Sequence, residues 1–182
     1  LVSVAGGKYT TYRVMAKDAV DAVGPYLGRS LPESATEHIP LVGAAPHRDD
    51  RLHSRYGTLA AEVEALAAGD EEMARPVVAD APYLMAELRY ATTHEGALHL
   101  DDVLTRRTRL SIETLDRGVD AARPAARVMG EALGWDEATM AREIEHYDAR
   151  VRAELDSQAK PDDRTADAAR MGAPDVRTGR AE

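Results

Sequence analysis

The sequence contains no cysteine and no phenylalanine, and aromatic residues make up only 4 % of its 182 positions. The absence of cysteine excludes disulfide bridges and thiolate metal sites, and it fits a reducing, cytoplasmic setting. With so few aromatic rings, a core must be built from Ala, Leu, Val and Met, which favours packed helices over a β-sandwich. These absences predict a mainly α protein.

Long apolar runs are also absent, and the 23 basic residues are outnumbered by 32 acidic ones. No apolar stretch approaches the ~20 residues that a bilayer-spanning helix needs, although this leaves peripheral membrane contact open. The formal net charge of −9 argues against nucleic-acid binding, because a phosphate backbone would be repelled over most of the surface. The basic island of Arg106, Arg107 and Arg109 is most simply a solvated or salt-bridged helix face.

Helical spacing of apolar residues dominates the chain. It runs from Thr10 to Val23 and stops at Gly24-Pro25. Residues 25–47 hold four of the nine prolines and no periodicity, which indicates a linker. Residues 48–158 contain capped helical stripes typical of a small helical bundle. Residues 159–182 are polar and form a predicted tail.

The first thirteen residues, LVSVAGGKYTTYR, stand apart from this pattern. Leu1–Ala5 predict a β-strand, and a lone strand cannot satisfy its backbone groups, so we expect the rest of its sheet to lie outside these residues. Gly6 and Gly7 allow a ligand to approach the backbone closely, and Lys8 adds a positive charge at the start of a helix. The turn therefore suits an anionic or electron-rich group, although strand, Gly-Gly, helix is also an ordinary tight turn.

Other candidate residues favour structural roles. His94, Glu95 and His99 miss the zincin spacing by one residue, so we expect no metal site there. Asp101 and Asp102 precede Arg106 and Arg107 by helical intervals that predict salt bridges within one helix. The apolar seam of the last predicted helix is expected to pack internally, with a dimer contact as the alternative; its members are Met140, Ile144, Tyr147, Val151 and Leu155.

Three separated stretches carry a family resemblance in the same order along the chain. They are SVAGGKYTTYRVMAKDAVDA at residues 3–22, YATTHEGALHLDDVLTRRTR at 90–109 and LGWDEATMAREIEHY at 133–147. Each resembles the C-terminal part of the FAD-dependent glycerol-3-phosphate dehydrogenases and the related glycerophosphate oxidases. The first stretch is similar to the family's connection between its FAD domain and its C-terminal cap.

The resemblance implies a domain organisation and a site. Residues 1–24 would be the end of the FAD-binding domain, 25–47 a linker, 48–158 the helical C-terminal cap and 159–182 a polar tail. The fold would thus be mainly α, a small helical bundle preceded by one terminal β-strand. The matching flavin-side positions are Gly6, Gly7, Lys8, Tyr9 and Thr10, with Lys8 as the catalytic candidate. Family members commonly carry Leu where this chain has Tyr9, which leaves only a backbone role for that position.

The implied function is oxidation of sn-glycerol 3-phosphate to dihydroxyacetone phosphate, with FAD as cofactor and a quinone as electron acceptor. No G-x-G-x-x-G fingerprint occurs in the sequence, so we expect this chain to be inactive without a missing N-terminal FAD domain. The implied location is cytoplasmic, with peripheral contact to the inner face of the cell membrane and a homodimer as open possibilities. The residues of this chain do not by themselves distinguish a quinone-linked dehydrogenase from an oxygen-using oxidase. The alternative from another class is a freestanding helical protein-interaction module.

Overall fold

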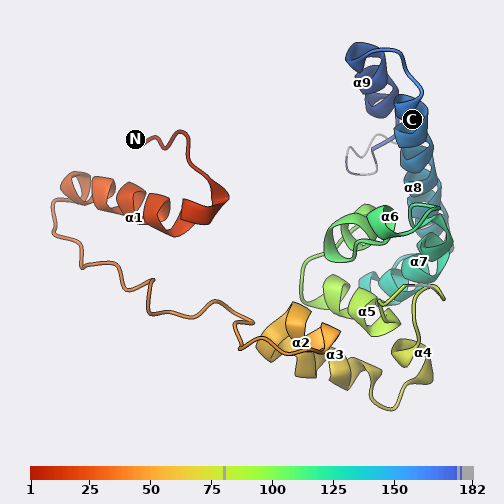
Figure 1. Ribbon diagram of the computed structural model, residues 1–182, viewed down its shortest axis with the longest axis horizontal. Coiled ribbons are helices and arrows are strands. Elements are labelled where there is room, and N and C mark those ends of the chain that lie inside the picture. Colours follow the sequence, from red (N-terminus) through yellow and green to blue (C-terminus); the bar gives the residue numbers. More distant parts are fainter. Residues whose placement is uncertain (80, 176, 178–182) are drawn as a thin grey trace. The chain divides into compact units, whose positions relative to one another are not determined.

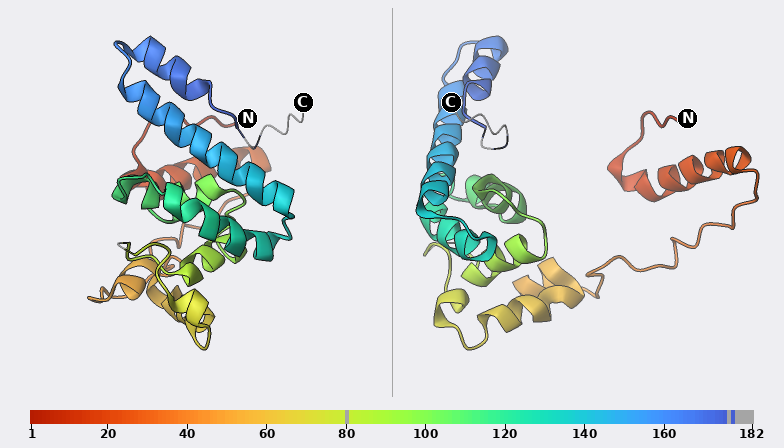
Figure 2. Two further views of the ribbon diagram at one scale, coloured as in Figure 1. Left: turned by 90° about the vertical axis from the view of Figure 1, so that its right-hand side faces the viewer. Right: turned by 180° about the vertical axis from the view of Figure 1, so that it is seen from behind.

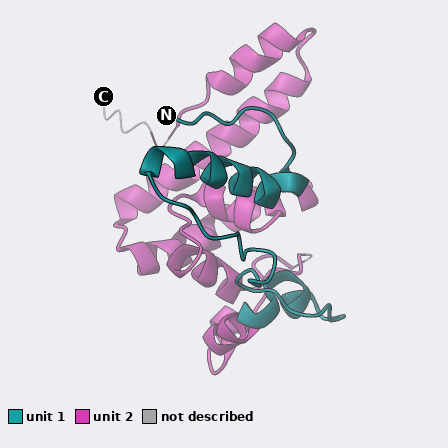
Figure 3. Ribbon diagram, turned by 90° about the vertical axis from the view of Figure 1, so that its left-hand side faces the viewer, with its two compact units in different colours: residues 1–59 teal, residues 60–182 magenta. Residues whose placement is uncertain are grey.

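The computed structural model describes residues 1–79, 81–175 and 177. The chain divides into two compact units, Leu1–Leu59 and Ala60–Glu182 (Figure 3). Both are helical, and the single β-type pairing among the described residues is an isolated bridge between Pro76 and Leu84. The mainly α class predicted from the composition is confirmed.

The first unit is built around one amphipathic helix. Residues 1–8 have no regular secondary structure, and a 3-10 turn η1 then leads into α1 (Figure 1). The predicted stop at Gly24-Pro25 is confirmed, since α1 ends at Val23. The elements of this unit are η1 (Tyr9–Thr11), α1 (Tyr12–Val23), η2 (Gly24–Leu27), α2 (Arg51–Tyr56) and η3 (Gly57–Leu59).

The predicted strand at Leu1–Ala5 is wrong as a statement about this chain. A strand is stabilised by hydrogen bonds to a neighbouring strand, and none of the described residues pairs with this segment. The apolar alternation is present, but without a partner it remains an exposed, irregular segment. Val4, for example, is 58 % exposed.

The second unit is a helical bundle with one continuous core (Figure 2). Helix α5 packs on α3 and α7, and α7 packs on α8. The largest fully buried side chains are Met85, Leu88, Leu100, Leu104, Leu110 and Met129. The elements are α3 (Ala60–Ala67), α4 (Glu71–Ala74), α5 (Met85–Thr93), the π-helical turn η4 (Asp102–Arg107), α6 (Leu110–Glu113), α7 (Val119–Leu133), α8 (Glu137–Gln158) and α9 (Asp163–Met171).

Small residues allow the central helices to approach closely. Four alanines of α7, at positions 121, 122, 125 and 126, are at most 1 % exposed and face this core. An alanine surface lets two backbones lie nearer to each other than leucine would, so many weak dispersion contacts replace the missing aromatic volume. The core of Ala, Leu, Val and Met that the composition predicts is therefore confirmed.

The turn between α7 and α8 was predicted correctly from Gly134 and Asp136. Gly134 ends α7 in the left-handed conformation, at φ 71°. The Asp136 carboxylate then accepts a hydrogen bond of 2.8 Å from the Thr139 amide and caps α8. Tyr147 and Val151 of the predicted seam are buried in the core of this chain, whereas Leu155 is 48 % exposed.

The segment predicted as a polar tail contains helix α9. The Asp162 carboxylate accepts from the Thr165 amide at 2.9 Å, which gives the helix a defined start. Helix α9 folds back along α8 (Figure 2). Among the described residues, none of the helices combines the length and the apolar character that crossing a membrane requires.

Candidate functional site

The turn Gly6–Thr10 places the five predicted site residues next to one another at the start of α1. Gly6 and Gly7 both take positive φ values, 81° and 99°, in the region that favours glycine. Lys8 returns to an extended conformation, and its carbonyl accepts hydrogen bonds from both the amide and the hydroxyl of Thr11, each at 3.0 Å. These bonds close η1 and fix the path of the backbone into α1.

The two glycines serve different purposes. Gly7 lies close to α1: a Cβ there would be 2.1 Å from the Sδ atom of Met15, a flexible side chain that can move, whereas the φ of 99° would strain any side chain. A Cβ at Gly6 would meet no atom within 4 Å, so the backbone there faces open space. A cavity of about 380 Å³ lies beside this turn, between the first seven residues and one face of α1.

The charged and aromatic members of the turn are accessible. All five residues from Gly6 to Thr10 are exposed. The rings of Tyr9 and Tyr12 stack with their centroids 5.6 Å apart, which turns the Tyr9 side chain along the helix. Lys8 therefore stands as an accessible cation at the positive end of α1.

This geometry fits one side of a flavin site. Open backbone at Gly6, an accessible Lys8 and the amino end of α1 all suit the electron-rich edge of an isoalloxazine ring. The same residues cannot hold a dinucleotide by themselves, because the chain contains no glycine-rich phosphate loop. The turn could therefore supply cofactor contacts, and the remaining contacts would have to come from elsewhere.

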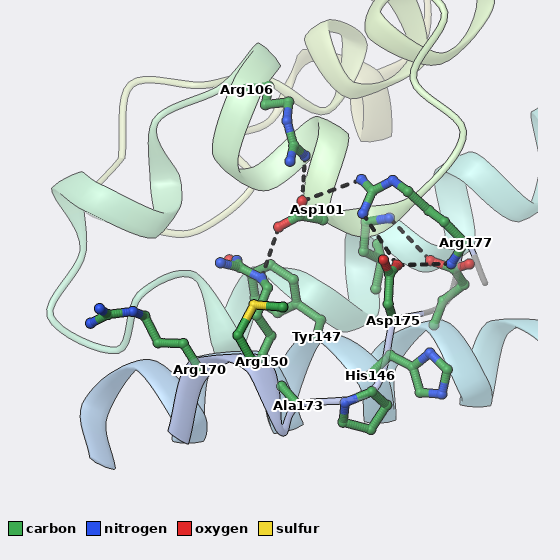
Figure 4. Close-up of a pocket in the computed structure, with 13 residues that line it drawn as sticks. Asp101, Arg106, His146, Tyr147, Arg150, Arg170, Ala173, Asp175 and Arg177 are labelled. Atoms are coloured by element: carbon green, nitrogen blue, oxygen red, sulfur yellow. Dashed lines mark hydrogen bonds and ion pairs between the residues drawn. The ribbon is translucent and has the colours of Figure 1, made fainter. Parts of the chain in front are cut away.

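A second polar cluster lies in the other unit and centres on Asp101 (Figure 4). Its carboxylate pairs with Arg106, with Nε of Arg150 at 2.8 Å and with a guanidinium nitrogen of Arg177 at 3.3 Å. Burial disfavours the charged form of Asp101, but the hydrogen bonds and charges of these arginines outweigh it and hold the pKa below its usual range. The carboxylate thus joins η4, α8 and the C-terminal segment.

Sequence reasoning found only the local part of this cluster. The predicted pairs of Arg106 with Asp101 and Asp102 are confirmed. Arg107 behaves differently from the prediction, because its guanidinium donates to the Glu95 carbonyl at 2.8 Å. The contacts from Arg150 and Arg177 were missed, and spacing along the chain carries no signal for them.

A buried carboxylate forms another long-range link that sequence reasoning missed. The side chain of Glu143 on α8 is 4 % exposed and accepts from Nδ1 of His99 at 2.8 Å. It also accepts from the buried backbone amide of Leu100 at 3.2 Å. Glu143 therefore anchors α8 to the segment that precedes η4.

The histidines singled out as metal candidates have other roles. The His94 ring stacks on Tyr90 with centroids 4.5 Å apart, and His99 pairs with Glu143. Within residues 1–79, 81–175 and 177, no three His, Asp or Glu side chains group in a way that could hold a metal ion.

The Tyr90 phenol is buried and donates a hydrogen bond to Glu62. Both effects raise the pKa of Tyr90 to about 12.

Known proteins resemble this chain over nearly its whole length. The family described as the C-terminal domain of alpha-glycerophosphate oxidase matches residues 25–140. Glycerol-3-phosphate dehydrogenase 2 of Mycobacterium tuberculosis is 45 % identical over 97 % of this chain and 34 % of its own length. Glycerol-3-phosphate dehydrogenase of Mycobacterium leprae is also 45 % identical, over 98 % of this chain and 34 % of its own length.

A more distant relative extends the same result. Glycerol-3-phosphate dehydrogenase of a Synechocystis strain is 29 % identical over 81 % of this chain and 30 % of its own length. No solved structure matches the chain significantly. The chain thus spans about a third of the length of the curated relatives that it matches.

Proposed function

The chain belongs to the family of the C-terminal domain of alpha-glycerophosphate oxidase, and from this premise we propose that it is the C-terminal part of an FAD-dependent glycerol-3-phosphate dehydrogenase. The whole enzyme would oxidise sn-glycerol 3-phosphate to dihydroxyacetone phosphate and pass the two electrons to a quinone. The observation that carries this proposal is the 45 % identity to relatives of that name over 97 % of the chain.

The turn Gly6–Thr10 is the part of this chain that we assign to the flavin. Bound FAD would supply the acceptor for the hydride that leaves C2 of the substrate as its hydroxyl loses a proton. In this assignment the open backbone at Gly6 would leave room for the edge of the flavin. Lys8 and the amino end of α1 would stabilise the negative charge that builds there. Tyr9 and Thr10 would contribute backbone contacts only.

Exposed apolar side chains in the first unit support packing against another part of the enzyme. In the described residues of α1 no side chain is buried, and Val14 and Val20 are 48 % and 58 % exposed. Further along the first unit, Ile39, Leu41 and Val42 are all more than 60 % exposed. Covering this surface would remove apolar area from water, so we assign it to the contact with an FAD-binding domain.

The electron acceptor sets the expected location. Because a quinone acceptor resides in the membrane, the proposal includes a cytoplasmic enzyme in peripheral contact with the inner face of the cell membrane. A homodimer stays an open alternative that the acceptor does not decide. Residues 48–158 would then serve as the helical cap that completes the enzyme.

The test compares this 182-residue chain with a protein of the relatives' full length that contains it. Flavin absorbance of each purified protein is recorded before and after anaerobic addition of glycerol 3-phosphate. We expect the longer protein to be yellow and to bleach, and this chain alone to be colourless. A longer protein without flavin would overturn the enzyme proposal and leave the protein-interaction module as the working hypothesis.

Lys8→Ala in the longer protein tests the flavin-side role. Removing one preorganised electrostatic contact lowers turnover by roughly 10²-fold, and the reduction rate of the flavin should fall by a similar factor. Lys160→Ala is the matched control, since it removes the same charge from an exposed position after α8. Equal turnover in the two variants would refute the role assigned to Lys8.

A further inference from the structure

Helix α9 and the described residues after it, 172–175 and Arg177, form one wall of a cavity in the second unit. The cavity has a volume of about 290 Å³. Its inner wall is formed by four residues of α8, namely Glu143, His146, Tyr147 and Arg150. The outer wall comes from α9 and from the residues after it, which contribute Arg170, Met171, Ala173, Pro174, Asp175 and Arg177. Figure 4 shows Asp101 between Arg106, Arg150 and Arg177, with Ala173 and His146 below it.

Charge, and not apolar packing, holds this outer wall in place. Within the described part of the chain, α9 has no buried residue, and Met171 is 85 % exposed. Its polar contacts are few: Arg170 donates to the Ser157 hydroxyl at 3.1 Å and pairs with Asp167. Because little apolar area is removed from water, these contacts and the ion pairs of Arg177 provide most of the free energy that holds α9 against α8.

Arg177 makes the contacts that reach farthest across the chain. Its guanidinium lies 2.9 Å from a carboxylate oxygen of Asp102 and 3.3 Å from one of Asp101. Asp175 contacts both parts of this residue: its carboxylate accepts from the Arg177 backbone amide at 2.9 Å and lies 3.6 Å from a guanidinium nitrogen. Asp101 and Asp102 are fixed independently by Arg106, so they offer a preformed acceptor pair.

The cavity contains a polar atom without a partner among the described residues. Nδ1 of His146 is buried and makes no hydrogen bond there. A buried polar atom without a partner is unfavourable, so access of water or a small polar molecule to this atom would offset part of the cost of opening the wall.

We propose that α9, residues 172–175 and Arg177 act as a salt-sensitive strap that opens and closes this cavity, held closed by the ion pairs of Arg177 with Asp101 and Asp102. The side chain of Arg177 is 40 % exposed, so salt screens its ion pairs. Release of the guanidinium loosens the strap, because α9 has no fully buried residue within the described part of the chain. Opening exposes His146 and Glu143 on α8.

Chemical labelling of His146 measures the opening. The protein is treated with diethylpyrocarbonate, and the labelling rates of individual histidines are read from their peptides by mass spectrometry. His38, whose side chain is 80 % exposed, is the internal reference because its access should not depend on the strap. The readout is the rate at His146 divided by the rate at His38.

Arg177→Gln should raise this ratio by roughly two- to five-fold, the effect of one half-exposed ion pair on a local equilibrium. Salt at about 1 M should raise it similarly in the unchanged protein and little in the variant, because the Debye length falls to about 3 Å. Arg164→Gln is the matched control, since it removes the same charge from an exposed position of α9. Its ratio should equal that of the unchanged protein.

Amide hydrogen exchange over Asp163–Met171 provides the second readout. It should accelerate in Arg177→Gln and not in Arg164→Gln, because α9 is part of the strap. Equal labelling ratios in the two variants would overturn the proposal. Faster labelling with unchanged exchange in α9 would also overturn it, because the cavity would then open by another route.

Discussion

Replacing Glu143 with Ala should destabilise the helical bundle more than any change at an exposed acidic residue. Its carboxylate is 4 % exposed and accepts two hydrogen bonds, from Nδ1 of His99 at 2.8 Å and from the Leu100 amide at 3.2 Å. The alanine variant removes both acceptors at once. It also leaves a void where the side chain lies between α8 and the start of η4.

The expected cost is about 2–4 kcal/mol in the free energy of unfolding. Leu100 is 1 % exposed, so its amide loses its acceptor inside the fold, and an unsatisfied buried donor costs roughly 1–3 kcal/mol. The His99 side chain is 25 % exposed and can recover part of its hydrogen bonding from water. The lost side-chain volume adds to the cost, since the surroundings collapse only in part. Glu143→Gln keeps one acceptor oxygen and should cost about half as much.

Urea unfolding followed by Trp135 fluorescence measures these changes. Trp135 is the single tryptophan of the chain and packs against the bundle core, so it reports on the unit that contains Glu143. Glu145→Ala, an exposed change on the same helix, should stay within about 0.5 kcal/mol of the unchanged protein. A loss at Glu143→Ala no larger than at Glu145→Ala would refute the anchoring role.

Two further predictions concern the groups around the cavity. Tyr147→Phe should cost about 0.5–1.5 kcal/mol by the same urea assay, because the phenol donates to the Arg117 carbonyl at 2.7 Å. The same change should remove a phenol that titrates late, since burial raises the pKa of Tyr147 to about 12; an unchanged alkaline absorbance titration would contradict this. Asp101→Asn should make the free energy of unfolding fall less steeply as the pH is lowered. The pKa of Asp101 lies below its usual 3.8 in the fold, so its ionised form stabilises the protein at neutral pH and this contribution is lost as the pH falls through the folded pKa. Urea midpoints measured between about pH 5 and pH 3 should therefore fall less in the variant, and parallel curves would refute the assignment.

Local chemistry explains why several elements could be predicted. The end of α1 at Gly24-Pro25, the left-handed Gly134 and the Asp136 cap each depend on residues within one helical turn. The pairs of Arg106 with Asp101 and Asp102 also depend on short spacing. The sequence stretches similar to glycerol-3-phosphate dehydrogenases placed the chain in its family for the same reason, because a resemblance is read position by position.

The predictions that failed or were never made depend on distant partners. Leu1–Ala5 has the apolar pattern of a strand, but a strand exists only where a second strand supplies hydrogen bonds. Glu143 and His99 lie 44 positions apart, and Arg177 and Asp101 lie 76 positions apart. No periodicity links such positions, so nothing in the sequence distinguishes them from solvated charges.

The sequence by itself determined the helical class, the helix ends at Gly24, Gly134 and Asp136, and the glycine turn before α1, because backbone preferences and capping act between near neighbours. Only the tertiary structure decided which carboxylates are buried and which arginines meet them. Burying a charge is favourable only when an oppositely charged or hydrogen-bonding group lies within hydrogen-bond distance. The packing of helices far apart in the chain sets the distance between the two groups. The cavity between α8 and the C-terminal segment follows from that packing alone.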